Sequence, residues 1–296
     1  MACTRSINEV LISYDLTLGA IIVGTLGPAY LSLYLIPRLK SINTWYLAAL
    51  GVGLTFWFFI DTMGDADYLE VNSAIYPFSL FGGAGHFALI ATFAAGIAAL
   101  AIIDHYAVPS PLVRETMQVQ TKADGGTAYL SKSLVLIPIA IAAVMGIHGM
   151  GEGWDFASVA ASATTGNLVS AFGGWNAVIS YPLHKFFEAS IIAIAYTCYV
   201  SRTDLAKKAA WHIPVLGLFF GLTSVIGSAL GYYISVDTTY FYAFGVTAAF
   251  YATFRLVEAS NQNFKIGITA PTFLGGKRFL ALGVGFFLLY TAALFH

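Results

Sequence analysis

Charged residues are scarce in this chain. Asp, Glu, Lys and Arg together make up 10% of its 296 residues, whereas soluble domains usually carry about a quarter. Only two cysteines are present, Cys3 and Cys198, too few and too far apart for a disulfide framework or a zinc ribbon. The formal net charge of −1 gives no basis for nucleic-acid binding. These shortages argue against a soluble domain, a disulfide scaffold and a nucleic-acid-binding protein.

Apolar residues dominate instead, at 58% of the chain. About twenty consecutive apolar residues cross a bilayer as a helix, and windows of that length predict an all-α integral membrane protein with eight transmembrane helices. The predicted helices lie near 17–36, 46–63, 80–103, 134–154, 175–200, 211–234, 239–257 and 279–296. The N-terminus lacks a basic segment followed by a short apolar core and a cleavage site, so we expect no removed signal peptide.

Basic residues are concentrated in alternate predicted loops. Twelve of the 14 Lys and Arg residues lie in or beside the loops that follow the first, third, fifth and seventh predicted helices. Because cytoplasmic loops carry an excess of Lys and Arg, these loops are predicted to face the cytoplasm, and an even number of helices then places both termini outside. The longest polar connection, about 105–133, becomes a cytoplasmic loop. The chain 1–296 is treated as a single membrane domain.

Two His-x-x-x-Glu pairs stand inside predicted membrane helices. His148 and Glu152 belong to the sequence HGMGEG in the fourth helix, and His184 and Glu188 belong to HKFFEAS in the fifth. Residues four apart share one face of a helix, so each pair can direct two ligand side chains at one point. Ionisable groups at this depth are costly and usually functional. Together the pairs predict a four-ligand metal site within the bilayer.

The chemistry of these ligands narrows the choice of metal. Imidazole and carboxylate groups suit zinc, iron, manganese, cobalt or nickel better than calcium or magnesium.

Deformable positions lie beside both pairs, since the fourth helix has glycines at 146, 149, 151 and 153 and the fifth has Pro182. Glycines allow close helix approach or local bending, and a membrane proline frees a backbone carbonyl. In the alternative interpretation, these His and Glu side chains only hydrogen-bond backbone carbonyls or pair with Lys185.

Lys185 is the other unusual residue of the fifth helix. It follows His184 directly and lies three residues before Glu188, within reach on a helix. Its ammonium could occupy a second cation position beside the glutamates, or it could only neutralise Glu188 or Glu152 as an ion pair. Both interpretations predict one mobile metal ion rather than two.

Three further residues are candidates for the entry or release of a cation. Asp61 and Asp65 crowd the outer end of the second predicted helix, where they could form an electrostatic funnel. A solvated acidic loop is the alternative for Asp65, whereas Asp61 lies deeper. His212 stands at the inner start of the sixth predicted helix, where it could assist release.

These motifs resemble those of the Zrt/Irt-like (ZIP) family of divalent-metal transporters. HGMGEG at 148–153 is similar to the HNxPEG motif of the family's fourth helix, and HKFFEA at 184–189 to the H-x-x-x-E-G motif of its fifth. The segments GVGLTFWFFIDTMGDAD (51–67) and GLTSVIGSALG (221–231) resemble its second and sixth helices. The resemblance implies an eight-helix bundle in which helices one, four, five and six move against the other four. Metal would bind the two His-x-x-x-Glu pairs from outside and be released inward.

The chain departs from the family pattern at the second metal position. Gly149 stands where many members place an Asn, Lys185 where a second-site acid can occur, and Ser224 where the sixth helix has a Glu. The resemblance therefore implies that the primary site is kept and the second is lost. Asp61 and Asp65 stand where the second-helix motif has His and Glu, and their role stays open.

We therefore expect a carrier, not an enzyme, that brings zinc, iron or manganese into the cytoplasm through one intramembrane site. Its expected partners are the metal substrate, the bilayer and, by family analogy, a second copy of the chain. We expect it in the plasma membrane. We expect no organic cofactor. Two other classes stay open. One is an intramembrane zinc-dependent hydrolase with a glutamate as general base, although no HExxH motif is present. The other is a non-transporting membrane subunit that keeps the ZIP-like scaffold.

Overall fold

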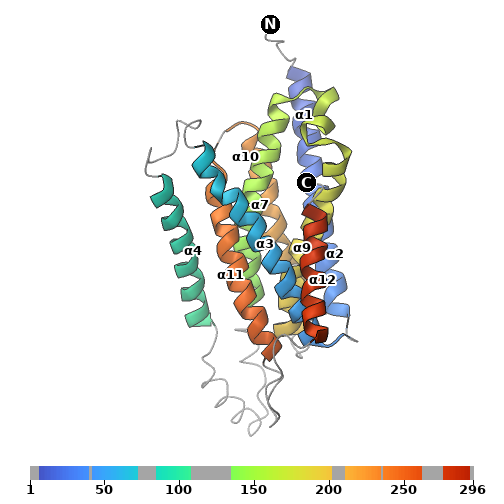
Figure 1. Ribbon diagram of the computed structural model, residues 1–296. Helices are drawn as coiled ribbons and strands as arrows, with labels where there is room; N and C mark the ends of the chain where they lie inside the picture. Colours follow the sequence, from blue (N-terminus) through green and yellow to red (C-terminus); the bar gives the residue numbers. More distant parts are fainter. Residues whose placement is uncertain are drawn as a thin grey trace, which may run out of the picture.

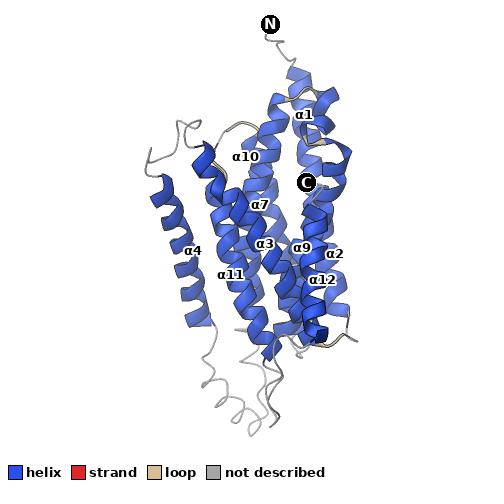
Figure 2. Ribbon diagram, in the orientation of Figure 1, coloured by secondary structure: helices blue, strands red, loops and turns tan. Residues whose placement is uncertain are grey.

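The computed structural model describes residues 7–39, 42–72, 85–107, 135–201, 211–234, 236–261 and 276–293. These residues form helices and connecting turns, with no strand among them (Figure 2). Apolar side chains dominate the helices. In a bilayer the backbone must satisfy its own hydrogen bonds, which a helix does within one segment. The all-α expectation is therefore confirmed for the described part of the chain.

Long helices account for most of this structure (Figure 1). Their bounds are α1 Ile7–Ile21, α2 Gly27–Leu35, α3 Thr44–Asn72, α4 Gly85–Ala107, α7 Leu136–Ser162, α8 Leu168–Ala171, α9 Gly174–Tyr196, α10 His212–Gly231, α11 Thr239–Asn261 and α12 Gly276–Ala293. A π-helical turn, Ile22–Leu26, joins α1 to α2 just before Pro28, and another, Thr197–Ser201, follows α9. Each of the eight predicted windows overlaps one of these helices.

Within the described residues, five segments are long and apolar enough to cross a membrane, as expected of an integral multi-pass protein. They are Asn8–Arg38, Tyr46–Met63, Leu136–Ser162, Gly174–Val200 and His212–Gly231. Shorter apolar helices, Ile90–His105 and Leu280–Leu289, lie within α4 and α12. Two helices extend well beyond their predicted windows, α3 to Asn72 and α7 to Ser162. The windows ended where polar residues begin, but backbone hydrogen bonding continues through such residues.

Glycines bring α7 and α10 into backbone contact. A Cβ atom on Gly146 or Gly153 would collide with the carbonyl of Phe219 or Ser224 in α10, and one on Gly227 would collide with the carbonyl of Met150 in α7. The expected role of the α7 glycines in close helix approach is thus confirmed. The two helices consequently pack as one tight pair.

The helix α9 runs through the middle of the bundle. Ala189 and the run Ile191–Tyr196 are buried, and they pack in the main apolar core with α2, α3, α7, α10, α11 and α12. This C-terminal half of α9 is apolar on every side, and such a segment is buried on every side. By contrast α4 stands at one edge of the bundle, beside α11 (Figure 1). The central position of α9 carries His184, Lys185 and Glu188 into the interior, opposite the glycine-rich part of α7.

Candidate metal centre

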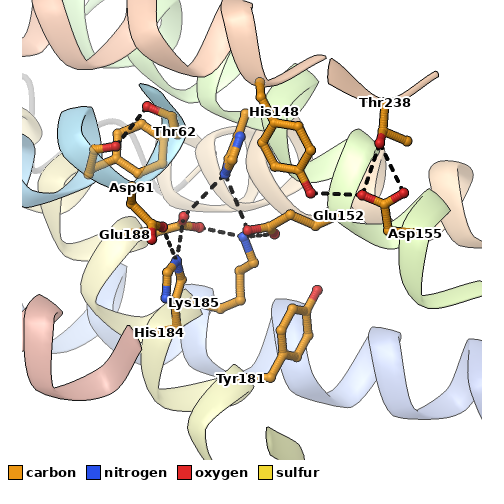
Figure 3. Close-up of polar contacts among 12 residues, drawn as sticks. Asp61, Thr62, His148, Glu152, Asp155, Tyr181, His184, Lys185, Glu188 and Thr238 are labelled. Atoms are coloured by element: carbon orange, nitrogen blue, oxygen red, sulfur yellow. Dashed lines mark hydrogen bonds and ion pairs between the residues drawn. The ribbon is translucent and has the colours of Figure 1, made fainter. Parts of the chain in front are cut away.

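Both His-x-x-x-Glu pairs lie inside the bundle. His148 and Glu152 occupy successive turns of α7, and His184 and Glu188 occupy successive turns of α9. Their exposed fractions are 1%, 8%, 3% and 0%, respectively. The two pairs face each other across the contact between α7 and α9 (Figure 3). The structure therefore brings together the four residues that the motifs single out.

Three of these residues form a compact group of potential ligands. His148 Nε2 lies 3.2 Å from Glu152 Oε1 and 3.5 Å from Glu188 Oε1. One ligand atom from each of the three residues lies within 4.8 Å of the other two. Nitrogen and oxygen ligands sit about 2.0–2.2 Å from zinc, so neighbouring ligands around one ion are roughly 3–4 Å apart. The buried group His148, Glu152 and Glu188 could hold a metal ion.

The fourth predicted ligand, His184, joins the group from the opposite side of Glu188. Its Nε2 lies 3.0 Å from Glu188 Oε1 and 3.8 Å from Asp61 Oδ2 (Figure 3). One carboxylate oxygen, Glu188 Oε1, is thus shared by both imidazoles. His184 is thus a neighbour of the compact group and not one of its three members. Asp61 of α3 lies beside His184.

Lys185 lies between the two glutamates. Its Nζ lies 2.5 Å from Glu188 Oε2 and also forms an ion pair with Glu152 Oε2. The rings of Tyr181 and Phe220 flank the ammonium, each with its centroid 5.7 Å away. The Lys185 side chain is fully buried. The two oxygens of each carboxylate therefore have different partners: Oε2 faces Lys185, and Oε1 faces one or both imidazoles. The ion pair that the sequence offered as one interpretation of Lys185 is present, and it reaches both glutamates.

The surroundings of His148 fit a bound cation. Rings of Phe58 in α3 and Tyr242 in α11 meet its imidazole edge to face, with centroids 5.0 and 5.1 Å away. A Cβ on Gly245 would lie 2.9 Å from His148 Nδ1, so the backbone of α11 closes that side. Both ring nitrogens are buried; Nδ1 has no hydrogen-bond partner among the described residues, whereas Nε2 faces the carboxylate oxygens of Glu152 and Glu188. A metal ion bound at Nε2 would lie between this nitrogen and those two oxygens, which are ligand types that transition metals accept.

Sequence reasoning missed the polar cluster one turn beyond Glu152. The Tyr242 hydroxyl donates a hydrogen bond of 2.8 Å to Asp155 Oδ2. The Thr238 hydroxyl donates to both oxygens of the same carboxylate, at 2.9 and 3.0 Å (Figure 3). These bonds attach α11 and the turn before it to α7. Asp155 stands three residues after Glu152, a spacing that could have indicated a shared helix face. Its partners in α11 gave no such signal.

Two departures from the family pattern lie against each other in the structure. A Cβ on Gly149 would stand only 2.6 Å from Ser224 Oγ, so a larger residue at 149 requires the hydroxyl to move. Ser224 Oγ is buried and has no hydrogen-bond partner within the described ranges. The small residues at 149 and 224 thus lie where α7 and α10 pack closely.

The remaining predicted residues have different outcomes. Asp61 contacts His184, as given above. Asp65 lies in α3, but its side chain falls outside the described residues. His212 is buried at the start of α10, with Nδ1 3.4 Å from the Tyr196 hydroxyl. Because Tyr196 lies twelve residues after His184 on α9, His212 is roughly 18 Å along the helix axis from the metal centre. The structure does not bring it into the group, and its role in release stays a prediction.

The fold and the site indicate a class: a helical protein whose long apolar helices suit a multi-pass membrane protein, with a buried His/Glu group that could hold a metal ion. No family model, curated protein or solved structure matches the chain. The resemblance to ZIP transporters therefore depends on the motifs quoted above.

Proposed function

We propose that this protein carries a divalent transition-metal cation across the membrane into the cytoplasm. Zinc, iron or manganese would be its substrate, and transport would occur by alternating access through one intramembrane site. The observation that carries the proposal is the buried group of His148, Glu152 and Glu188, with His184 3.0 Å from Glu188. Such ionisable groups within membrane helices usually mark a path for ions or substrate.

The ligand set supports a transition metal of intermediate softness. Imidazole nitrogens and carboxylate oxygens favour zinc, iron and manganese, and no sulfur ligand lies in the described group to favour Cu(I). Lys185 supports a single ion, because its ammonium already contacts Oε2 of both glutamates. A second divalent ion beside those oxygens would face a buried positive charge at close range.

The packing supports a division into two moving parts. In the proposal, α1, α2, α7, α9 and α10 form the transport unit, and α3, α4, α11 and α12 form the scaffold. Backbone contacts join α7 to α10, so these two helices would move together. Side-chain contacts such as Tyr242 to His148 join α7 to α11. The π-helical turns Ile22–Leu26 and Thr197–Ser201, and Pro182 within α9, provide places where the transport unit can bend.

The proposal also includes the orientation of the chain in the membrane. Eight crossings would place both termini outside and the 105–133 loop in the cytoplasm, at the same end as Arg38 and Arg255. A plasma-membrane location, and a dimer of two copies, belong to the proposal through the family resemblance alone.

Uptake of radioactive zinc, iron(II) or manganese(II) into proteoliposomes tests the proposal. We expect saturable uptake by the wild-type protein and its loss in His148→Ala and Glu188→Ala. His105→Ala is the matched control, because His105 is exposed at the end of α4, away from the metal centre. Stoichiometric metal binding without saturable uptake would contradict the carrier. That outcome would favour an intramembrane metallohydrolase or a non-transporting subunit.

A further inference from the structure

Asp61 occupies the rim of the metal centre. It lies on α3, near the end of the apolar segment Tyr46–Met63, whereas the other acidic groups of the site lie on α7 and α9. Its carboxylate is 27% exposed, while the side chains of Glu152 and Glu188 are 9% and 0% exposed. Its Oδ2 lies 3.8 Å from His184 Nε2 (Figure 3). Asp61 is thus the accessible acid of the cluster.

The net charge of the inner group is too small to neutralise a divalent cation, and Asp61 can supply the remaining negative charge. Glu152 and Glu188 share the ammonium of Lys185, so the two carboxylates and the ammonium together carry a single negative charge. A divalent cation bound there would leave one positive charge uncompensated in the protein interior, which is costly. The carboxylate of Asp61 supplies the missing negative charge. Lys185 therefore makes the net charge around the bound ion more positive, and Asp61 makes it more negative.

The distance between Asp61 Oδ2 and His184 Nε2 allows one ion to contact both residues. Two ligands about 2.0–2.2 Å from one ion are roughly 3–4 Å apart. His184 Nε2 has a carboxylate oxygen at such a distance on each side, Glu188 Oε1 at 3.0 Å and Asp61 Oδ2 at 3.8 Å. Glu188 Oε1 in turn faces His148 Nε2 at 3.5 Å. A chain of ligands runs from Asp61 through His184 and Glu188 to His148.

We propose that Asp61 and His184 form an outer half-site, where a divalent transition-metal cation docks before it passes to His148, Glu152 and Glu188. The inference deepens the proposed carrier function and, in its transport role, rests on it. Glu188 Oε1 lies 3.0 Å from His184 Nε2 and also belongs to the inner group, so it connects the outer half-site to the inner one. Because Asp61 lies on the proposed scaffold and His184 on the transport unit, movement of the unit separates the half-site and commits the ion to the inner group.

Co²⁺ binding to the purified protein tests the half-site without requiring transport. Co²⁺ reports its ligands through visible absorption, so stopped-flow mixing gives an association rate and titration gives a stoichiometry. We expect Asp61→Asn to slow association about tenfold, because an acidic group at the mouth of a site raises the local cation concentration. Stoichiometry should stay at one ion. Asp61→Glu should restore the rate. Glu9→Gln removes the same charge from an exposed position in α1 and should leave the rate unchanged.

A double variant isolates the outer half-site. His148→Ala removes a ligand of the inner group only, so weak Co²⁺ binding should remain, with an altered spectrum. Adding Asp61→Asn should abolish this residual binding. Circular dichroism and size-exclusion elution check that each variant is folded.

The outcomes separate this inference from the carrier. An unchanged association rate in Asp61→Asn, or residual binding in His148→Ala that does not depend on Asp61, would overturn the half-site. Complete loss of Co²⁺ binding in folded Asp61→Asn would make Asp61 an inner ligand, which also overturns it. Wild-type binding without uptake refutes the carrier alone, and the association rates still decide the half-site. Absence of wild-type Co²⁺ binding refutes both.

Discussion

The ammonium of Lys185 lies 2.5 Å from Oε2 of Glu188 and leaves the other oxygen of that carboxylate to the imidazoles. Oε1 of Glu188 is 3.0 Å from His184 and 3.5 Å from His148. The same division is seen at Glu152, where Oε2 pairs with Lys185 and Oε1 faces His148. A fixed ammonium therefore holds both glutamates with one oxygen directed at the position where a metal would bind. Lys185 thereby orients the ligands besides balancing their charge.

Replacement of Lys185 by methionine tests this role. Lys185→Met leaves two buried carboxylates without their cation, and breaking a buried ion pair from one side costs about 3–5 kcal/mol. We expect the metal-free variant to melt at a lower temperature than the wild type. Added Zn²⁺ should stabilise it more than it stabilises the wild type, because the site has gained one unit of negative charge. Thermal unfolding in detergent, with and without Zn²⁺, measures both effects.

Lys185→Arg is the matched control because it keeps the positive charge, and it should respond to Zn²⁺ as the wild type does. A Lys185→Met protein with wild-type stability and wild-type response to Zn²⁺ would show that the ammonium neither supports nor screens the glutamates.

The shared carboxylate should matter more than the unshared one. Glu188 Oε1 faces both imidazoles, whereas Glu152 Oε1 faces His148. We expect Glu188→Gln to weaken Zn²⁺ binding by at least about a hundredfold, equivalent to about 3 kcal/mol. Glu152→Gln should weaken it less. Competition titration with a chelating dye gives both dissociation constants.

Glu258→Gln serves as the control for the loss of a part-buried carboxylate, since Glu258 pairs with Arg255 away from the metal centre. Its Zn²⁺ affinity should match the wild type. Equal losses in Glu188→Gln and Glu152→Gln would argue against a shared oxygen.

Tyr242 should contribute to stability and to the site through different parts of its side chain. Its hydroxyl donates to Asp155, while its ring packs on His148. Tyr242→Phe removes only the hydroxyl, so we expect a loss of about 1 kcal/mol in stability with metal affinity unchanged. Tyr242→Ala should also weaken metal binding, because the ring that positions His148 is gone. Thermal unfolding and Zn²⁺ titration separate the two effects, and a loss of affinity in Tyr242→Phe would place the hydroxyl in the site.

The contact between α7 and α10 should tolerate no side chain at Gly153. A Cβ there would collide with the backbone carbonyl of Ser224, and neither backbone can yield cheaply. We expect Gly153→Ala to destabilise the protein by about 1–3 kcal/mol, as overpacking of a tight interface does. Gly19→Ala in α1 is the control, because a Cβ at Gly19 meets nothing within 4 Å. Melting temperatures of the two variants should differ clearly; equal values would mean that α7 and α10 can separate freely.

Part of the candidate site was predictable because it is local. The spacing of His148 and Glu152, and of His184 and Glu188, guarantees a shared face once each segment is helical. The reach of Lys185 to Glu188 follows from the same geometry. Its ion pair with Glu152 joins two helices, and the sequence could offer it only as an alternative.

Other parts of the site depend on which helices are neighbours. Nothing in the spacing of α9 indicates that His184 lies beyond Glu188 from His148, or that Asp61 of α3 meets it there. The hydrogen bonds from Thr238 and Tyr242 to Asp155 join residues more than eighty positions apart. These relationships require four helices, α3, α7, α9 and α11, to be placed and rotated together, and each rotation is set by many small packing contacts.

The sequence by itself determined that this protein is helical and apolar enough for a membrane, and that two helices each carry an imidazole and a carboxylate on one face. Backbone hydrogen bonding and the helical repeat are sufficient for both conclusions. Only the tertiary structure decided that three of these groups form a compact buried cluster, and that Lys185 divides the oxygens of both carboxylates. It also decided that Asp61 stands at the rim beside His184. The reason is that these distances run between helices, where close packing through glycine and interlocking side chains sets the geometry.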